Sequence, residues 1–402
     1  MTAAQEARHG ARTAAPMPRR RRVGVTRLVL TDFRNYHALR LDFAPDGESG
    51  PVVLTGPNGA GKTNLLEALS FLSPGRGLRN ARLGDIDRRS PGDAAAVSGW
   101  AVAATLDTPA GSVRIGTGRD PAGGERRAVR LDGESARGQS ALAERLGVLW
   151  LTPAMDRLFA EGPAGRRRLM DRLVLGLDPA HAARVARYEQ AMRERSRLLR
   201  DRMDDPAWLA ALEEVMAAEG VAVAAARREA VERLDEVCAA ADGAFPRARL
   251  AVAGTLEAWL GDMPALAVEE RFRAALGDAR PVDTLSGGAT TGPHRSDLAV
   301  VHADKGIAAE IASTGEQKAL LVAIVLGQAK LQRTVRGMAP LLLLDEVAAH
   351  LDPARRRALY DILAGLDSQA WITGTEPAPF APLAGIARFL SVRDGTLTET
   401  DL

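Results

Sequence analysis

The chain has 402 residues, 46% of them hydrophobic, which is enough for a large buried core and, at usual domain sizes, for two lobes. Its formal net charge is only +2, so composition excludes a globally basic surface, and any basic surface for nucleic acid must be local. No apolar run approaches the roughly 20 residues of a membrane helix, so we expect no membrane association. The single cysteine, Cys238, cannot form an internal disulfide, which favours a cytoplasmic location.

The first 24 residues are rich in Ala, Arg and Pro and carry no apolar periodicity. We predict a disordered basic tail over residues 1–24. Its basic cluster at 19–22 is either a solvated charge run or an arm that contacts DNA phosphates. Ordered structure is predicted to begin with a strand at 27–31, followed by a second strand near 39–43.

A phosphate-binding motif follows a third predicted strand at 52–55. Residues 56–63 match G-x-x-x-x-G-K-[ST] at every fixed position, and the apolar residues behind them recur at helical spacing. Glycines let successive N–H groups point at one phosphate, and a helix N-terminus adds partial positive charge. We predict that ATP binds here, that Lys62 reaches the β- and γ-phosphates, and that Thr63 offers its hydroxyl to Mg²⁺. The predicted nucleotide-binding residues are Gly56, Pro57, Asn58, Gly59, Ala60, Gly61, Lys62 and Thr63.

The middle of the chain changes character twice. Alternating apolar residues after Trp100 and a turn at 131–133 predict an antiparallel sheet beside the parallel nucleotide core. Residues from about 165 to 240 are rich in Arg, Glu, Ala and Leu, which predicts a helical lobe, and the interruption at 204–206 predicts a hairpin or short bundle. The predicted domains are a split ATPase domain at 25–152 and 285–402, with a mainly helical insertion at 153–284.

The second half of the predicted ATPase domain contains a Walker B element. Leu341–Leu344 is wholly apolar, as in a strand buried on both faces, and Asp345 and Glu346 follow it. We predict that Asp345 coordinates Mg²⁺ and that Glu346 polarises the attacking water, which makes Lys62 and Glu346 the predicted catalytic residues. Two adjacent carboxylates at a strand end need a cation or hydrogen-bond donors to offset them. Further strands are predicted at 307–311 and 370–373.

A third segment, Ser313-Thr314-Gly315-Glu316-Gln317-Lys318, precedes a predicted buried helix at 318–331. It resembles the signature sequence of ABC-type ATPases, whose Ser hydroxyl and Gly amides contact a γ-phosphate held by another subunit. Ser313 and Gly315 would take these roles here, although the same segment would also cap a helix well. Leu351-Asp352 resembles the D-loop. The motif order indicates an α/β fold: an ABC-type P-loop ATPase head with a flanking antiparallel sheet and an inserted helical lobe.

Further runs at 30–36, 57–59, 151–153, 165–171 and 291–298 resemble the RecF family of SMC-like ATPases. The resemblance implies ATP-dependent binding of single-stranded or gapped DNA in replication, repair and recombination, with recombinase loading and SOS inducibility. It implies an ATP-dependent homodimer, weak DNA-dependent ATPase activity, recombination mediator proteins as partners, and Arg34 among the nucleotide-binding residues. An ATPase subunit of an ABC transporter is the alternative, but transporters do not share the runs at 32–36 and 292–298. A metabolic kinase would not need residues 313–318.

The chain departs from the usual ABC pattern in three places. Thr373-Gly374-Thr375-Glu376 stands where a switch histidine usually follows the strand after Walker B. No glutamine occurs between Thr63 and Gln139, so no conventional Q-loop can be placed, and Glu316 adds negative charge to the signature. All three predict slow hydrolysis.

The run Arg166-Arg167-Arg168 is the densest candidate for DNA contact in the ordered chain. Pairing with nearby acids such as Asp171 is the slightly favoured alternative, because exposed charged faces are common on helices.

Overall fold

The computed structural model describes residues 22–43, 50–88, 99–119, 126–201 and 205–401. Most of the predicted tail, including the arginines at 19–21, lies outside these ranges. Its last residues are part of the fold, because Val23 is buried and bridges to Ser368, and Gly24 begins the first strand.

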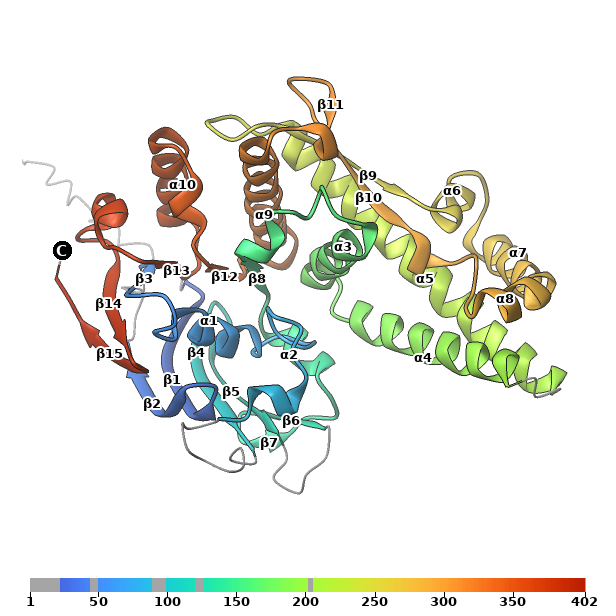
Figure 1. Ribbon diagram of the computed structural model, residues 1–402, viewed down its shortest axis with the longest axis horizontal. Helices are drawn as coiled ribbons and strands as arrows, with labels where there is room; N and C mark the ends of the chain where they lie inside the picture. Colours follow the sequence, from blue (N-terminus) through green and yellow to red (C-terminus); the bar gives the residue numbers. More distant parts are fainter. Residues whose placement is uncertain (1–21, 44–49, 89–98, 120–125, 202–204, 402) are drawn as a thin grey trace, which may run out of the picture.

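A six-stranded sheet forms the centre of the nucleotide core (Figure 1), in the order β15-β14-β3-β13-β12-β8. All neighbours pair in parallel except β15, which is antiparallel to β14. Strands β3, β13 and β12 are buried at every residue, as strands covered on both faces should be. The strand bounds are β3 (Val52–Thr55), β8 (Val148–Leu151), β12 (Leu341–Leu344), β13 (Ala370–Gly374), β14 (Arg388–Arg393) and β15 (Thr396–Glu399).

One face of this sheet is covered by α1 (Lys62–Ser70) and then by a second sheet, antiparallel throughout, in the order β2-β1-β4-β5-β6-β7. Its strands are β1 (Gly24–Phe33), β2 (Tyr36–Asp42), β4 (Ala101–Thr108), β5 (Gly111–Arg119), β6 (Arg127–Leu131) and β7 (Glu134–Ser135). Two short helices, η1 (Leu83–Ile86) and α2 (Ser140–Arg145), complete this part. The predicted flanking antiparallel sheet and its turn at 131–133 are confirmed.

The opposite face of the parallel sheet is covered by α9 (Thr314–Arg336) and α10 (Pro353–Gly365) (Figure 1). Alternate residues of β12 serve the two sides: Leu341 and Leu343 pack with the α1 cluster, whereas Leu342 and Leu344 pack with the α9 cluster. The predicted buried helix at 318–331 is confirmed, and it is longer at both ends.

The helical lobe contains α3 (Pro163–Leu177), α4 (His181–Arg200) and α5 (Pro206–Ala239). Helices α4 and α5 form a long hairpin that extends away from the parallel sheet, with α6 (Thr255–Asp262), α7 (Ala265–Asp278) and α8 (Arg280–Ser286) toward its far end (Figure 1). The predicted break before Pro206 is confirmed: the Asp205 side chain accepts the Trp208 N–H at 2.9 Å and caps α5. A further break, between α3 and α4, was not predicted.

A small sheet in the order β11-β10-β9 lies along the lobe. Its strands are β9 (Ala248–Ala253), β10 (Asp297–His302) and β11 (Ile307–Ala308). The strand predicted at 307–311 is too long, because the chain turns into η4 (Ala309–Ile311) after two residues. Strands β9 and β10 pair over six residues although the predicted domain boundary at 284/285 separates them. Local sequence patterns do not contain this long-range pairing.

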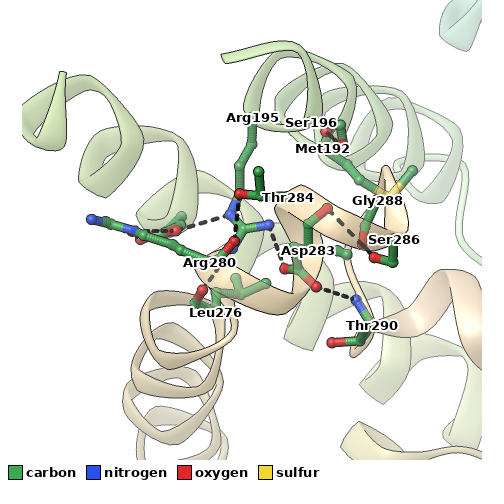
Figure 2. A network of polar contacts seen from close by, with 12 residues as sticks. Met192, Arg195, Ser196, Leu276, Arg280, Asp283, Thr284, Ser286, Gly288 and Thr290 are labelled. Carbon is green, nitrogen blue, oxygen red and sulfur yellow. Dashed lines mark hydrogen bonds and ion pairs between the residues drawn. The ribbon is translucent and has the colours of Figure 1, made fainter. Parts of the chain in front are cut away.

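A buried polar network ties the far helices together (Figure 2). Arg195 of α4 donates to Glu213 of α5 at 2.9 Å, to Asp283 of α8 at 2.7 Å, and to the Leu276 carbonyl of α7 at 2.6 Å. A separate hydrophobic cluster surrounds it, to which α4, α5, α6 and α7 contribute. The lobe therefore has its own core.

Candidate functional site

The loop Gly56–Gly61 connects β3 to α1, as the motif requires. Gly61 has φ 115°, and a Cβ there would lie 2.6 Å from Asn35 Nδ2 and 2.8 Å from Tyr36 Oη. Gly56 has φ 146°, and a Cβ there would lie 2.2 Å from the Val392 carbonyl oxygen. Both positions exclude a side chain for steric as well as conformational reasons.

Residues of the turn between β1 and β2, and the first residue of β2, hydrogen-bond to this loop. Tyr36 donates its hydroxyl to the Gly61 carbonyl at 3.0 Å, and Asn35 donates its amide to the Ala60 carbonyl at 3.3 Å. The sequence singled out this run only through a family resemblance, and its contact with the phosphate-binding loop required the tertiary structure.

Arg34, which was predicted to bind nucleotide, forms a bidentate ion pair with Glu67 of α1 at 2.7–2.8 Å. Glu67 is fully buried and also accepts from Arg79 at 2.9 Å. Glu67 was not predicted from the sequence, since one acid on a helix gives no signal of its own. Arg34 thus lies against α1, and its contact with nucleotide stays a prediction.

Lys62 lies at the start of α1 with its side chain folded over the loop. Its ammonium group donates to the carbonyls of Gly56 at 2.7 Å and Pro57 at 2.9 Å. Burial lowers the pKa of Lys62, whereas the nearby carboxylates of Glu346 and Asp345 favour its charged form. The predicted cation therefore lies near both predicted acids.

Thr63 and Asp345 meet across 282 residues of sequence. The Thr63 hydroxyl lies 3.0 Å from each carboxylate oxygen of Asp345, which is 4% exposed at the end of β12. A hydroxyl and a carboxylate are oxygen donors of the kind Mg²⁺ takes together with phosphate oxygens, so these two residues fit the ion. Among the described residues no group of three His, Cys, Asp or Glu could hold a metal by itself.

Glu346 adopts a left-handed backbone conformation with φ 54° directly after the strand. Its N–H donates to the Thr373 hydroxyl at 2.9 Å, and this hydroxyl donates in turn to Asp345 Oδ1 at 2.7 Å. The sequence marked position 373 only as part of a departure from the ABC pattern, so this link was missed.

Ser313 and Gly315 lie elsewhere, exposed at the start of α9. The Glu316 carboxylate accepts from Ser313 N–H at 2.9 Å and from its hydroxyl at 2.8 Å, as in a capping box, and also pairs with Lys305. These hydrogen bonds and the ion pair hold the pKa of Glu316 at about 2. The helix-capping role of the segment is therefore confirmed, and its role toward a second subunit stays a prediction.

A cavity of about 1020 Å³ lies between the nucleotide core and the helical lobe. Thr63, Asp345 and Glu346 contribute to its wall, together with the segment 73–80 and parts of α3 and α4. Ser313 and Gly315 do not line it. The structure therefore joins the phosphate-binding loop to Walker B and leaves the signature on a separate surface.

The run at 291–297 contacts the lobe helices. His294 Nδ1 lies 2.7 Å from the hydroxyl of Tyr188 in α4, and its Nε2 lies 2.8 Å from the Ala289 carbonyl oxygen. Because a carbonyl only accepts, Nε2 carries the proton, and Tyr188 is the donor to Nδ1. Burial lowers the pKa of His294, which suits this neutral form. The arrangement indicates a structural role.

The arginines at 166–168 are only partly available. Arg166 is buried and forms a bidentate pair with Asp297 at 2.7–2.8 Å, and Arg167 donates to the Ser296 carbonyl at 3.0 Å. Asp171 instead accepts from Arg227 and contacts His181 at 2.9 Å. Arg168 is exposed. The favoured pairing with acids is thus correct for Arg166, but with Asp297 rather than Asp171.

Together, the two sheets, the phosphate-binding loop and the Walker B pair define an α/β ATPase head of the SMC and RecF type. The chain belongs to the RecF family: the family model described as "RecF/RecN/SMC N terminal domain" matches residues 24–396.

Curated relatives carry the name "DNA replication and repair protein RecF". The protein of Mesorhizobium japonicum is 51% identical over 385 residues, which covers 94% of this chain and 98% of the relative. Those of Rhizobium meliloti and Brucella suis biovar 1 are each 48% identical, again over 94% of this chain, and cover 99% and 96% of the relatives. These names do not support the alternative of a transporter subunit.

Two solved structures share the fold. "Structure of the recombination mediator protein RecF-ATPrS in RecFOR pathway" superposes with a TM-score of 0.80 at 19% identity, covering 95% of this chain and all of that one. Its counterpart described as "RecF-ATP" gives a TM-score of 0.77 at 19% identity, covering 94% and 99%. Within the described part of the chain, no helix is both long and apolar enough to span a bilayer.

Proposed function

We propose that this protein binds ATP and DNA in replication, repair and recombination, and that ATP joins two copies of the chain. The observation that carries the proposal is the cluster of Thr63, Asp345 and Glu346, assembled at the phosphate-binding loop from two distant sequence segments. The replication and repair function is proposed from relatives at 48–51% identity, whose matches to this chain cover nearly the whole length of each relative. ATP is proposed as the nucleotide because a solved structure of the same fold is described as "RecF-ATP".

The nucleotide role is divided among residues whose positions are known. Backbone N–H groups of the loop 56–61 and the N-terminus of α1 bind the phosphates. Lys62 exchanges its present acceptors, the carbonyls of Gly56 and Pro57, for β- and γ-phosphate oxygens. Thr63 and Asp345 hold Mg²⁺, which neutralises phosphate charge when bound. Arg34 is proposed as a further nucleotide contact, because the next two residues, Asn35 and Tyr36, hydrogen-bond to the loop.

Hydrolysis requires a group that orients water, and Glu346 is the residue proposed for it. Glu346 lines the cavity together with Thr63 and Asp345. The position after Thr373 is a glycine, and a Cβ at Gly374 would lie 2.4 Å from a ring carbon of Phe380. No switch histidine could occupy that position without moving Phe380. The lack of an imidazole at this position supports slow hydrolysis, and the dependence of hydrolysis on DNA stays a prediction from the family.

The homodimer is proposed because the two halves of the ATPase apparatus do not meet in one chain. Ser313 and Gly315 are exposed and lie outside the cavity that the phosphate-binding loop and Walker B share. In a two-fold dimer, each signature can close over the triphosphate of the other copy, which gives two composite sites. ATP would then stabilise the interface, and hydrolysis would weaken it.

DNA binding is best tested by equilibrium titration of gapped and single-stranded DNA with ATP, with ADP and without nucleotide. We expect binding only with ATP, and a steep salt dependence, with the logarithm of the affinity falling by roughly 0.7 per phosphate contact on single strands for each unit of log salt. Equal affinity in all three nucleotide states would refute the proposal. The same titration with purified recombination mediator proteins tests them as partners.

The composite site is tested by mixing two inactive variants. Ser313→Arg places a bulky cation at the proposed interface and keeps its own phosphate-binding loop, whereas Lys62→Met keeps an intact signature. We expect each variant alone to be inactive, and the mixture to recover part of the ATPase activity through one intact composite site. Normal ATP-dependent dimerisation of Ser313→Arg in light scattering would contradict the model.

A further inference from the structure

Thr373 lies at the carboxyl end of β13, next to the Walker B strand. Strands β12 and β13 pair in parallel with Leu344 opposite Ile372, so the next residues along each strand, Asp345 and Thr373, are also neighbours. Thr373 is fully buried, and its branched Cβ limits the side chain to few rotamers. The hydroxyl is therefore fixed in place beside both acids.

This hydroxyl bonds with the two predicted acidic site residues at once. It donates its proton to Asp345 Oδ1 at 2.7 Å and accepts the backbone N–H of Glu346 at 2.9 Å. A threonine hydroxyl has only one proton to donate, so its single donor is committed to Asp345. One oxygen atom thus links the side chain of the first acid to the backbone of the second.

The hydrogen bond from the Glu346 N–H to Thr373 is important because of the backbone conformation of Glu346. Glu346 has φ 54°, a left-handed conformation that non-glycine residues adopt at an energetic cost. The hydrogen bond from its N–H to Thr373 holds this conformation, which sets the direction in which the carboxylate leaves the strand. Without it, the residue is free to relax toward an ordinary backbone conformation.

The hydrogen bond from the Thr373 hydroxyl to Asp345 orients the Asp345 carboxylate. Asp345 Oδ1 accepts the Thr373 hydroxyl, while the Thr63 hydroxyl lies 3.0 Å from each oxygen of the same carboxylate. If Thr63 turns its oxygen toward Mg²⁺, Thr373 remains as a neutral donor that keeps the Asp345 carboxylate in the same orientation. Because the hydroxyl is neutral, it orients the carboxylate without neutralising the negative charge that attracts the cation.

We propose that Thr373 is a positioning residue of the hydrolytic site, whose hydroxyl sets the orientation of Asp345 and Glu346 together. The proposal rests on the proposed function, since it assigns Mg²⁺ to Asp345 and water orientation to Glu346. At this strand end Thr373 therefore orients the two acids and does not sense the γ-phosphate. The next position, Gly374, has no room for a side chain beside Phe380.

The test compares Thr373→Val with Thr373→Ser. Valine keeps the shape and removes both hydrogen bonds, whereas serine keeps the hydroxyl. For Thr373→Val we expect unchanged ATP affinity in EDTA, a loss of about tenfold in the affinity gained on adding Mg²⁺, and a kcat lower by about tenfold to a hundredfold, since each unpaired buried polar group costs roughly tenfold. Thr373→Ser should recover most of both.

The matched control is Thr375→Val, the same replacement at an exposed threonine two residues further on, which should behave as wild type. Circular dichroism and thermal unfolding verify the fold of each variant. If Thr373→Val does not fold, Thr373→Ala replaces it, because a smaller side chain relieves strain; its Mg²⁺-dependent affinity should still fall below that of Thr373→Ser.

The readout separates positioning from a general structural defect. A structural defect would weaken ATP binding in EDTA and in Mg²⁺ alike, and that result would overturn the proposal, as would wild-type Mg²⁺ dependence and kcat in Thr373→Val. Failure of the proposed function is distinguishable, because then Lys62→Met and Glu346→Gln would also leave nucleotide binding and hydrolysis unchanged.

Discussion

Replacing Arg195 by methionine should destabilise the helical lobe without affecting the nucleotide site. Arg195 is fully buried and joins α4 to Glu213, Asp283 and the Leu276 carbonyl (Figure 2). Methionine fills much of the same space but removes the charge. Two buried carboxylates then lose a partner, and the consequences for them differ.

Glu213 keeps a bidentate pair with Arg280 at 2.6–2.9 Å, so its charge stays compensated. Asp283 is only 1% exposed and keeps a hydrogen bond from the Thr290 N–H at 3.0 Å. Removing one partner of a buried ion pair costs about 3–5 kcal/mol, mainly because the remaining charge is left unpaired. We therefore expect a loss of about 3–5 kcal/mol in the lobe, with Asp283 as its main source.

Hydrogen exchange is the appropriate assay, because it reports stability segment by segment. Amides of α8 (Arg280–Ser286) should exchange faster in Arg195→Met, whereas those of β12 (Leu341–Leu344) should not. Arg193→Met is the matched control, since Arg193 lies on the same helix but is exposed and makes only a 3.4 Å pair with Glu189. Its effect should stay within about 0.5 kcal/mol.

The double variant Arg195→Met/Asp283→Asn identifies the cause. If the unpaired carboxylate carries the loss, removing its charge should restore about 0.5–3 kcal/mol, the usual coupling between residues in contact. An Arg195→Met protein with wild-type exchange in α8 would refute the reasoning, and so would a double variant less stable than the single one. A large loss of ATP affinity would show that the lobe core and the nucleotide core are not independent.

Three further predictions concern the site and the pH dependence. Lys62→Met should lose ATP affinity and all ATP-dependent DNA binding, because the phosphates then meet backbone amides alone; unchanged affinity in equilibrium titration would remove Lys62 from this role. Glu346→Gln should bind ATP but hydrolyse it far more slowly, and normal turnover in a steady-state assay would contradict water orientation by Glu346. Burial by itself would raise the pKa of Glu213, but hydrogen bonds from Arg280 and Arg195 hold it below its ordinary value of 4.5. This stabilisation is fully present above pH 4.5 and is lost as the pH falls through the lower pKa of the folded state. In acid unfolding, the difference in stability between wild type and Glu213→Gln should therefore become smaller as the pH falls. A constant difference would contradict this prediction.

Local sequence patterns were enough to predict the elements of the nucleotide core. Strand β12 is wholly apolar and β3 is apolar up to its final threonine, and only strands covered on both faces bury such short runs completely. The phosphate-binding motif then placed Lys62 and Thr63 at a helix start, and the acids after β12 placed Asp345 and Glu346 at a strand end. These inferences depend on local patterns, which is why they were correct without any knowledge of distant contacts.

The contacts between distant segments became visible only in the folded chain. The bond between Thr63 and Asp345 spans 282 residues, the pairing of β9 with β10 crosses the predicted domain boundary, and the ion pair of Arg166 is with Asp297. Thr373 is the clearest case, because its sequence context showed only that a histidine was missing. Its function in the site depends on the register of β12 against β13, a relation between two strands that neither strand's own residues specify.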